Sequence, residues 1–137
     1  FWEKKMRKLL LATVASAAMA TAVSADDVKI GVFLGFTGPI ESLVAQMGPG
    51  AEAAIAEVSA SGAFMNGSTV TAIRADTTCV DAGAATAAAE RLITSDKVSG
   101  IVGGDCSGVT TATLTNVAMP NGMVMISPSA TSPALQL

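Results

Sequence analysis

Apolar residues group into four short runs, each bounded by glycine, charged or turn-forming residues. The first, Val28–Leu34, is almost continuously apolar, which is typical of a strand buried in a parallel sheet. The second, Thr69–Ala75, alternates and is rich in β-branched residues, which also favours a strand. Val98–Val102 and Met123–Ile126 complete the predicted set of strands.

Three segments with helical spacing separate these runs. The first is predicted to begin at about Pro49, because proline is tolerated at the first position of a helix, and to end at Gly62. The second is predicted from Asp81, a favourable N-cap residue, to about Ser95. The third is predicted over Gly108–Ala118.

The resulting order, β-α-β-α-β-α-β with short connections, predicts an α/β fold with an open parallel sheet and helices on both faces. Ligands of such sheets bind beyond the carboxyl ends of the strands. Here those ends lead into loops rich in glycine, serine, threonine and cysteine: Gly35–Pro39, Asp76–Cys79, Gly104–Ser107 and Ser127–Pro133. The sequence therefore predicts a binding edge on this side of the sheet.

Residues 6–25 have the pattern of a secretory signal peptide. Met6 is followed by two basic residues, by an uncharged and mostly apolar stretch too short to anchor the chain in a bilayer, and by small residues ending at Ala25. We predict cleavage after Ala25. Residues 1–5 are predicted to be a non-native extension, and residues 26–137, which end just after a proline-rich turn, are predicted to be a truncated domain.

The predicted cleavage makes the protein distinctly acidic. Residues 1–25 hold four of the eight basic residues and one of the eleven acidic ones, so residues 26–137 carry a net charge of −6. Such a surface repels a phosphate backbone, and we expect no nucleic-acid partner. The sequence also lacks histidine, the usual base of serine and cysteine nucleophiles and a common metal ligand.

The two cysteines, Cys79 and Cys106, have two interpretations. In an exported chain an even pair favours a disulfide, which would stabilise the fold by roughly 3–4 kcal/mol for a loop of this length. The alternative is a pair of buried free thiols, as in many proteins of reducing compartments. The predicted signal peptide favours the disulfide.

The segment GDCSG, residues 104–108, follows the third predicted strand and also has competing interpretations. It fits a cysteine version of the nucleophile elbow, with Cys106 as nucleophile, although no histidine is present to act as its base. Alternatively, the Ser107 hydroxyl and the amides behind it bind an anion where the third helix begins. In the simplest interpretation Ser107 is only the N-cap of that helix.

Five motifs together resemble a known family: GFTGP, GAEAAIAEV, ADTTC, GGDCSG and ISPSATSPAL. They are similar to the N-terminal lobe of periplasmic substrate-binding proteins of branched-chain amino acid ABC importers, over Val28–Leu135. The resemblance implies a type I periplasmic-binding-protein lobe, with the second lobe absent from this chain. It further implies a periplasmic, monomeric protein that is not an enzyme, uses no metal or cofactor, binds an amino acid and delivers it to an ABC permease in the inner membrane.

The resemblance also implies which residues bind the ligand. Ser107 would hold the α-carboxylate, the carbonyl of Ser129 would accept from the α-ammonium, and the hydroxyl and amide of Thr131 would donate to the carboxylate. Ala130 belongs to the same loop, and Leu43 falls where the family often has an aromatic residue lining the side-chain pocket. A competing interpretation of Thr131 is an ordinary turn-stabilising hydroxyl.

Two further implications concern the cysteines and the biological role. Cys79 and Cys106 match a disulfide present in several members of the family. The same fold also serves as a sensor or receptor ectodomain and binds amides, urea or aromatic acids in other members, so these remain alternatives to amino acid transport. A Cys106-dependent enzyme of the amidotransferase type is the third alternative.

Overall fold

The computed structural model of this protein describes residues 26–136. The predicted signal peptide, residues 6–25, and the preceding residues 1–5 lie outside the described residues, and cleavage after Ala25 stays a prediction. Among the helices of residues 26–136, none combines the length and the apolar character needed to cross a membrane.

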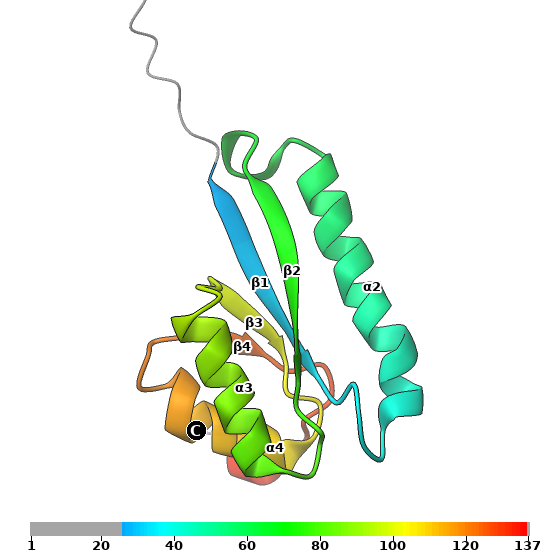
Figure 1. Ribbon diagram of the computed structural model, residues 1–137, viewed down its shortest axis with the longest axis vertical. Helices are drawn as coiled ribbons and strands as arrows, with labels where there is room; N and C mark the ends of the chain where they lie inside the picture. Colours follow the sequence, from blue (N-terminus) through cyan, green and yellow to red (C-terminus); the bar gives the residue numbers. More distant parts are fainter. Residues whose placement is uncertain (1–25, 137) are drawn as a thin grey trace, which may run out of the picture.

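A four-stranded parallel sheet forms the centre of the fold (Figure 1). Its order is β2-β1-β3-β4, with β1 at Asp27–Leu34, β2 at Thr69–Asp76, β3 at Gly100–Gly103 and β4 at Met125–Ile126. The predicted α/β class and parallel sheet are confirmed. β3 and β4 each begin two residues later than predicted. For β3 the reason is local: Lys97 has a positive φ of 59°, and the Val98 amide still donates to the Leu92 carbonyl at the end of the preceding helix.

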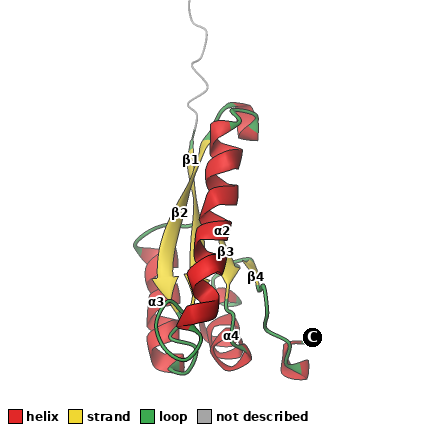
Figure 2. Ribbon diagram, turned by 90° about the vertical axis from the view of Figure 1, so that its right-hand side faces the viewer, coloured by secondary structure: helices red, strands yellow, loops and turns green. Residues whose placement is uncertain are grey.

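Helices cover both faces of the sheet, as predicted (Figure 2). Helix α2, Glu41–Ala60, packs against β1 and β2 on one face. Helices α3, Ala82–Thr94, and α4, Ser107–Thr113, cover the other, and a π-helical turn at Leu114–Ala118 continues α4. The larger core lies on the α3 and α4 side, around the fully buried Phe33 and Leu92.

The predicted start of the first helix at Pro49 is wrong, because α2 begins eight residues earlier, at Glu41. Proline inside a helix costs about 3 kcal/mol, since it removes one backbone hydrogen bond and crowds the preceding turn. Burial of the first turns offsets this cost. Val44 is only 1% exposed, and Gly48 lies so close to the Phe36 ring that a Cβ there would be 2.6 Å from it.

The second helix begins as predicted. Asp81 is the N-cap of α3, and its carboxylate accepts a hydrogen bond of 2.9 Å from the Ala84 amide. Ala85, Ala89 and Leu92 then form the buried side of the helix. This contact anchors α3 directly behind the loop that follows β2, so the cap and the predicted binding edge lie at the same end of the sheet.

Candidate functional site

The loops that follow the four strands meet at one edge of the sheet, at the lower end of Figure 1. This follows from the parallel arrangement, in which all carboxyl ends point the same way. Backbone hydrogen bonds of 3.0 Å join the end of β1 to its neighbours: the Gly104 amide donates to the Phe33 carbonyl, and the Thr77 amide donates to the Leu34 carbonyl. The predicted binding edge is therefore a single connected region.

At the centre of this edge lies a buried carboxylate, Asp105, which is 5% exposed. Its Oδ2 accepts from the Gly35 amide over 2.6 Å, and its Oδ1 accepts from the Thr77 hydroxyl and from the Cys106 amide, each over 3.0 Å. One side chain thus joins the loops after β1, β2 and β3. Asp105 was not among the residues predicted for the site. The available signal was a charged residue between glycine and cysteine directly after an apolar strand.

A disulfide joins the loops after β2 and β3. Cys79 and Cys106 are bonded, with an S–S distance of 1.99 Å and a Cα–Cα distance of 5.3 Å, so the predicted pairing is confirmed and the alternative of free thiols is wrong. The hypothesis of a Cys106 nucleophile fails with it, because nucleophilic attack requires a thiolate and this sulfur is in a disulfide. The bond also fixes the backbone immediately before Ser107.

Ser107 does not act as the N-cap of α4. Cys106 occupies the N-cap position, and Ser107 is the first helical residue. Its hydroxyl oxygen instead accepts from the amides of Thr131 and Ser132, over 3.1 and 3.2 Å. Ser107 therefore connects the start of α4 with the loop after β4, 24 residues further along the chain.

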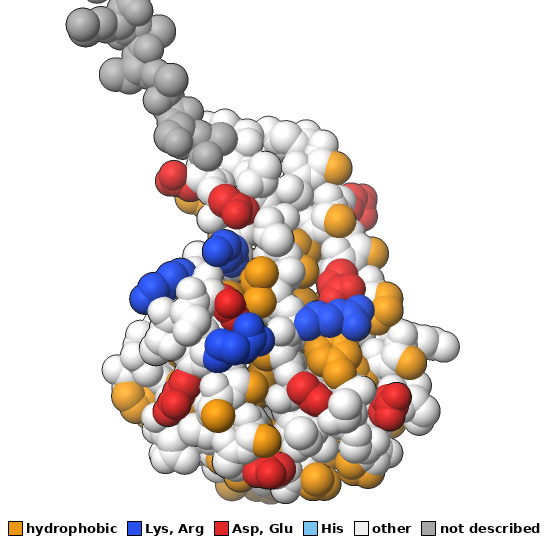
Figure 3. Space-filling view, in the orientation of Figure 1, with side chains coloured by type: hydrophobic (Ala, Val, Ile, Leu, Met, Phe, Trp, Pro, Cys, Tyr) orange, Lys and Arg blue, Asp and Glu red, His pale blue; other side chains and the backbone are white. Residues whose placement is uncertain are grey.

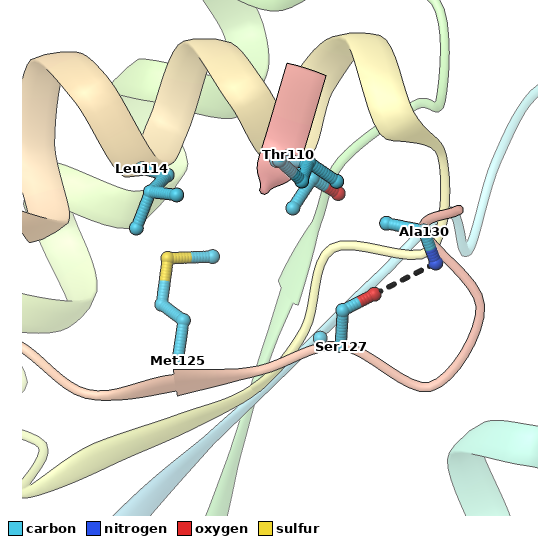
Figure 4. Close-up of a pocket in the computed structure, with 7 residues that line it drawn as sticks. Thr110, Leu114, Met125, Ser127 and Ala130 are labelled. Atoms are coloured by element: carbon cyan, nitrogen blue, oxygen red, sulfur yellow. Dashed lines mark hydrogen bonds between the residues drawn. The ribbon is translucent and has the colours of Figure 1, made fainter. Parts of the chain in front are cut away.

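Two further hydrogen bonds hold the loop after β4 against the residues that follow β3, and a third lies within the loop itself. The Ser129 hydroxyl donates to the Asp105 carbonyl over 2.8 Å, and the Ser127 hydroxyl donates to the Gly104 carbonyl over 2.5 Å. The Ala130 amide donates to the Ser127 hydroxyl oxygen over 2.9 Å, as Figure 4 shows. The structure thus brings together four predicted site residues: Ser107, Ser129, Ala130 and Thr131.

A small pocket lies between this loop and the α4 segment. Its volume is about 180 Å³. Figure 4 shows Leu114 and Thr110 on the helical side, with Met125 and Ser127 opposite. The lining is mainly apolar with two hydroxyls, and it suits a small apolar group better than a charged one.

Leu43 is not part of the group formed by the four other predicted site residues. It lies in the first turn of α2, a helix that packs on β1 and β2, and the residue is 65% exposed. Leu43 still lies toward the carboxyl ends of the strands, because α2 begins after the loop that follows β1. Its predicted contact with a ligand side chain stays a prediction.

A second carboxylate, Asp76, supports the edge from the end of β2. The Thr37 hydroxyl donates to it over 2.5 Å and the Thr78 amide over 2.8 Å. Burial by itself would raise the pKa of Asp76, but these hydrogen bonds, with those from the amides of Thr37 and Phe36, outweigh burial and lower the pKa below 3.8.

Replacing Asp76 with asparagine should remove an acid-sensitive part of the stability. The folded pKa lies below the unfolded value, so this contribution is complete above the unfolded pKa and is lost as the pH falls through the folded one. We expect Asp76→Asn to lower the free energy of unfolding by about 1 kcal/mol at neutral pH. Urea unfolding from about pH 6 to about pH 2 should show a smaller acid loss in the variant than in the wild type. Equal pH dependence in both would contradict this role.

Charges outside the edge are mixed. Arg74 donates to Glu52 through two nitrogens, lies over the Phe36 ring, and by its hydrogen bonds lowers the pKa of Glu52. On the face shown in Figure 3, Lys and Arg side chains lie among acidic ones. Within residues 26–136, no group of three or more His, Cys, Asp and Glu side chains is arranged to hold a metal ion.

Comparison with known proteins gives matches over this same region. A family model described as periplasmic binding protein matches residues 27–136. The "Leu/Ile/Val/Thr-binding protein" of Salmonella typhimurium is 32% identical over 128 residues, which are 93% of this chain and 34% of that protein. An "amino acid binding protein" of Pseudomonas aeruginosa is 34% identical over 132 residues, which are 96% of this chain and 34% of that protein.

A solved structure agrees with these sequence matches. The crystal structure of the branched-chain amino acid transporter substrate binding protein LivJ from Streptococcus pneumoniae, in complex with isoleucine, superposes with a TM-score of 0.71. It is 30% identical in sequence, and the match covers 79% of this chain and 30% of that one. The chain spans about a third of the length of the curated relatives it matches.

Proposed function

The chain belongs to the periplasmic binding protein family, and from this premise we propose that it contributes one wall of the binding site for an amino acid, branched-chain or similar, in an ABC import system. The main support for this proposal is that the amides of Thr131 and Ser132, in the loop at residues 129–132, donate hydrogen bonds to the Ser107 hydroxyl oxygen. The amino-acid-binding names of the relatives support the same ligand class. Binding and release without chemical change is the proposed activity, and the protein is proposed not to be an enzyme.

The hydrogen bonding of Ser107 leaves its hydroxyl suited to a carboxylate. A serine hydroxyl has two acceptor lone pairs and one hydrogen to donate. The amides of Thr131 and Ser132 occupy the acceptor side, so the hydrogen is left to point toward a ligand oxygen. Ser107 is only partly buried, which leaves it accessible. Hydrogen bonds to a charged carboxylate are stronger than those between neutral groups.

The loop after β4 is proposed to complete the ligand's polar contacts. The Ser129 carbonyl would accept a hydrogen bond from the ligand's α-ammonium group. The Thr131 hydroxyl would donate to the ligand's α-carboxylate, and Ala130, between these two residues, would lie beside the ligand. The Thr131 amide has a different partner from the one expected, because it donates to Ser107 Oγ in this structure. We therefore assign this amide to support of Ser107, and Leu43 to contact with the ligand's side chain.

The disulfide supports the proposed location. Such bonds persist in oxidising compartments, of which the bacterial periplasm is one. In the proposed role, a signal peptide ending at Ala25 directs the protein there. It then works as a monomer, without cofactor, metal or nucleic acid, and delivers the amino acid to a permease in the inner membrane.

Replacing Ser107 with alanine tests this assignment. Loss of one hydrogen bond to a charged group should weaken binding by about 1.5–3 kcal/mol, or roughly 10- to 150-fold in Kd. Calorimetric titration with leucine, isoleucine and valine measures this in protein expressed from the complete reading frame. Ser61→Ala, at the exposed carboxyl end of α2, is the matched control and should bind like the wild type. An unchanged Kd in Ser107→Ala would refute the role of Ser107.

A further inference from the structure

We propose that Asp105 is the positioning residue of this edge, holding Ser107 and the loop at residues 127–132 in the geometry that receives a ligand carboxylate. The inference rests on the proposed function and goes beyond it, because Asp105 is no part of the assigned ligand contacts. The carboxylate is buried and receives three hydrogen bonds from three different loops. Its own carbonyl accepts from Ser129, so one residue contacts the loops after all four strands.

The three partners of the Asp105 carboxylate are all donors, and this explains why the residue is an acid. Gly35 and Cys106 offer backbone amides. The Thr77 hydroxyl oxygen accepts from the Cys79 amide over 3.2 Å, so its hydrogen is directed to Asp105. A carboxylate only accepts, whereas asparagine would turn an NH₂ group toward one of these donors. Asp105→Asn keeps the size of the side chain but leaves at least one buried donor unpaired.

Two sets of hydrogen bonds connect Asp105 with the position of the Ser107 hydroxyl. Along the chain, the bond from the Cys106 amide to Oδ1 fixes the peptide unit directly before Ser107. Across the chain, the bond from the Ser129 hydroxyl to the Asp105 carbonyl fixes the loop whose Thr131 amide binds Ser107 Oγ. Asp105 therefore acts on the ligand through Ser107 and this loop.

The backbone conformation of Gly104, directly after β3, determines the direction of the Asp105 side chain. Gly104 has a φ of +51°, and a Cβ there would lie 2.3 Å from Thr110 Oγ1. Only glycine fits such a conformation without strain. With this backbone conformation at Gly104, the side chain of Asp105 is directed toward the Gly35 amide, which donates to it.

The test compares Asp105→Asn with Asp81→Ala in protein expressed from the complete reading frame. Leucine, isoleucine and valine are titrated calorimetrically, below the unfolding transition of each variant. We expect Asp105→Asn to raise the Kd at least about tenfold, the effect of one disrupted buried hydrogen bond. Asp81→Ala removes the N-cap of α3 at the same end of the sheet, so it should lower Tm and leave the Kd within twofold of the wild type.

Coupling separates positioning from a general loss of stability. Asp105 is proposed to act through Ser107, so the two substitutions should not have independent effects on binding. The fold-increase in Kd of the double variant Asp105→Asn/Ser107→Ala should therefore be smaller than the product of the two single-variant increases. Amide hydrogen exchange at Thr131 and Ser132, which needs no ligand, should also become at least about fivefold faster in Asp105→Asn. The inference would be overturned if the Kd of the double variant rose by the full product of the two single-variant increases. It would also be overturned if amide exchange at Thr131 and Ser132 were unchanged in Asp105→Asn.

The remaining outcomes are also decisive. If Asp105→Asn does not fold, Thr77→Val takes its place, because it removes one hydrogen-bond donor and keeps the Asp105 carboxylate. Thr77→Val should raise both the Kd and the exchange rates of the Thr131 and Ser132 amides. If Thr77→Val changes neither the Kd nor these rates, the inference is wrong. If the folded wild type binds none of these three and none of the other common amino acids, the proposed function fails, and the exchange experiment still decides the role of Asp105. If the wild type binds and Asp105→Asn binds equally well, only the inference fails.

Discussion

Replacing Gly103 with alanine should destabilise the protein by at least about 3 kcal/mol, because no side chain fits at the end of β3. Gly103 has a φ of +143°, and a Cβ there would lie 1.8 Å from the carbonyl oxygen of Phe33 and 2.6 Å from its carbon. These atoms belong to the backbone of the neighbouring strand, so no rotamer change can relieve the clash. The ends of β1 and β3 would have to separate.

Separation at this point would also displace Asp105, two residues further on, and with it the binding edge. Urea unfolding measures the stability loss, and calorimetric titration of the folded fraction measures the accompanying loss of affinity. Gly108→Ala is the matched control, since a Cβ at this helical position has no atom within 4 Å beyond its own neighbours. It should be neutral or slightly stabilising, as alanine is favoured over glycine in helices. Similar unfolding curves for Gly103→Ala and the wild type would contradict the geometry of the β1–β3 contact.

Reduction of the disulfide between Cys79 and Cys106 should lower the free energy of unfolding by roughly 3–4 kcal/mol. The two cysteines are 27 positions apart in the sequence, and the estimate follows from the conformational freedom that the unfolded chain loses when this loop is closed. It also holds Thr78 and Cys79, whose φ angles of 54° and 66° are unfavourable for residues with a Cβ.

Urea unfolding with and without a reductant measures this contribution. The double variant Cys79→Ala/Cys106→Ala should unfold at the midpoint of the reduced wild type and should not respond to the reductant. The hydrogen bond from the Thr77 hydroxyl to Asp105 joins the same two loops and does not depend on the disulfide. We therefore expect the reduced protein to retain its fold with weakened binding. A midpoint that is the same with and without reductant would show that the bond contributes nothing.

The order of elements was predictable from the sequence because local signals agree with the fold. Apolar strands, the Asp81 cap and the short connections all favour one parallel arrangement, which the structure has. The start of α2 was not predictable. Gly48, Pro49 and Gly50 resemble a helix boundary, and the local pattern does not show that Val44 is buried against β1 or that Gly48 packs against the Phe36 ring.

The candidate site was predictable in part. Position after a strand and resemblance to a family point to Ser107 and the loop at residues 129–131, and the structure brings these together. The hydrogen bonding of Ser107 and the burial of Asp105 could not be predicted, because both depend on loops that are distant in sequence. Asp105 lies 70 residues from its partner Gly35, and no local pattern encodes that contact.

Amino acid binding by this protein should appear as a ligand-dependent rise in thermal stability. The protein expressed from its complete reading frame would be heated with leucine, isoleucine, valine or the other common amino acids, and with isopentylamine, which resembles leucine without its carboxylate. A bound amino acid at 100 times its Kd should stabilise the fold by about 2.7 kcal/mol. We expect a clear rise in Tm with at least one branched-chain or similar amino acid and none with the amine. A folded protein whose Tm responds to no amino acid, or equally to the amine, would contradict it.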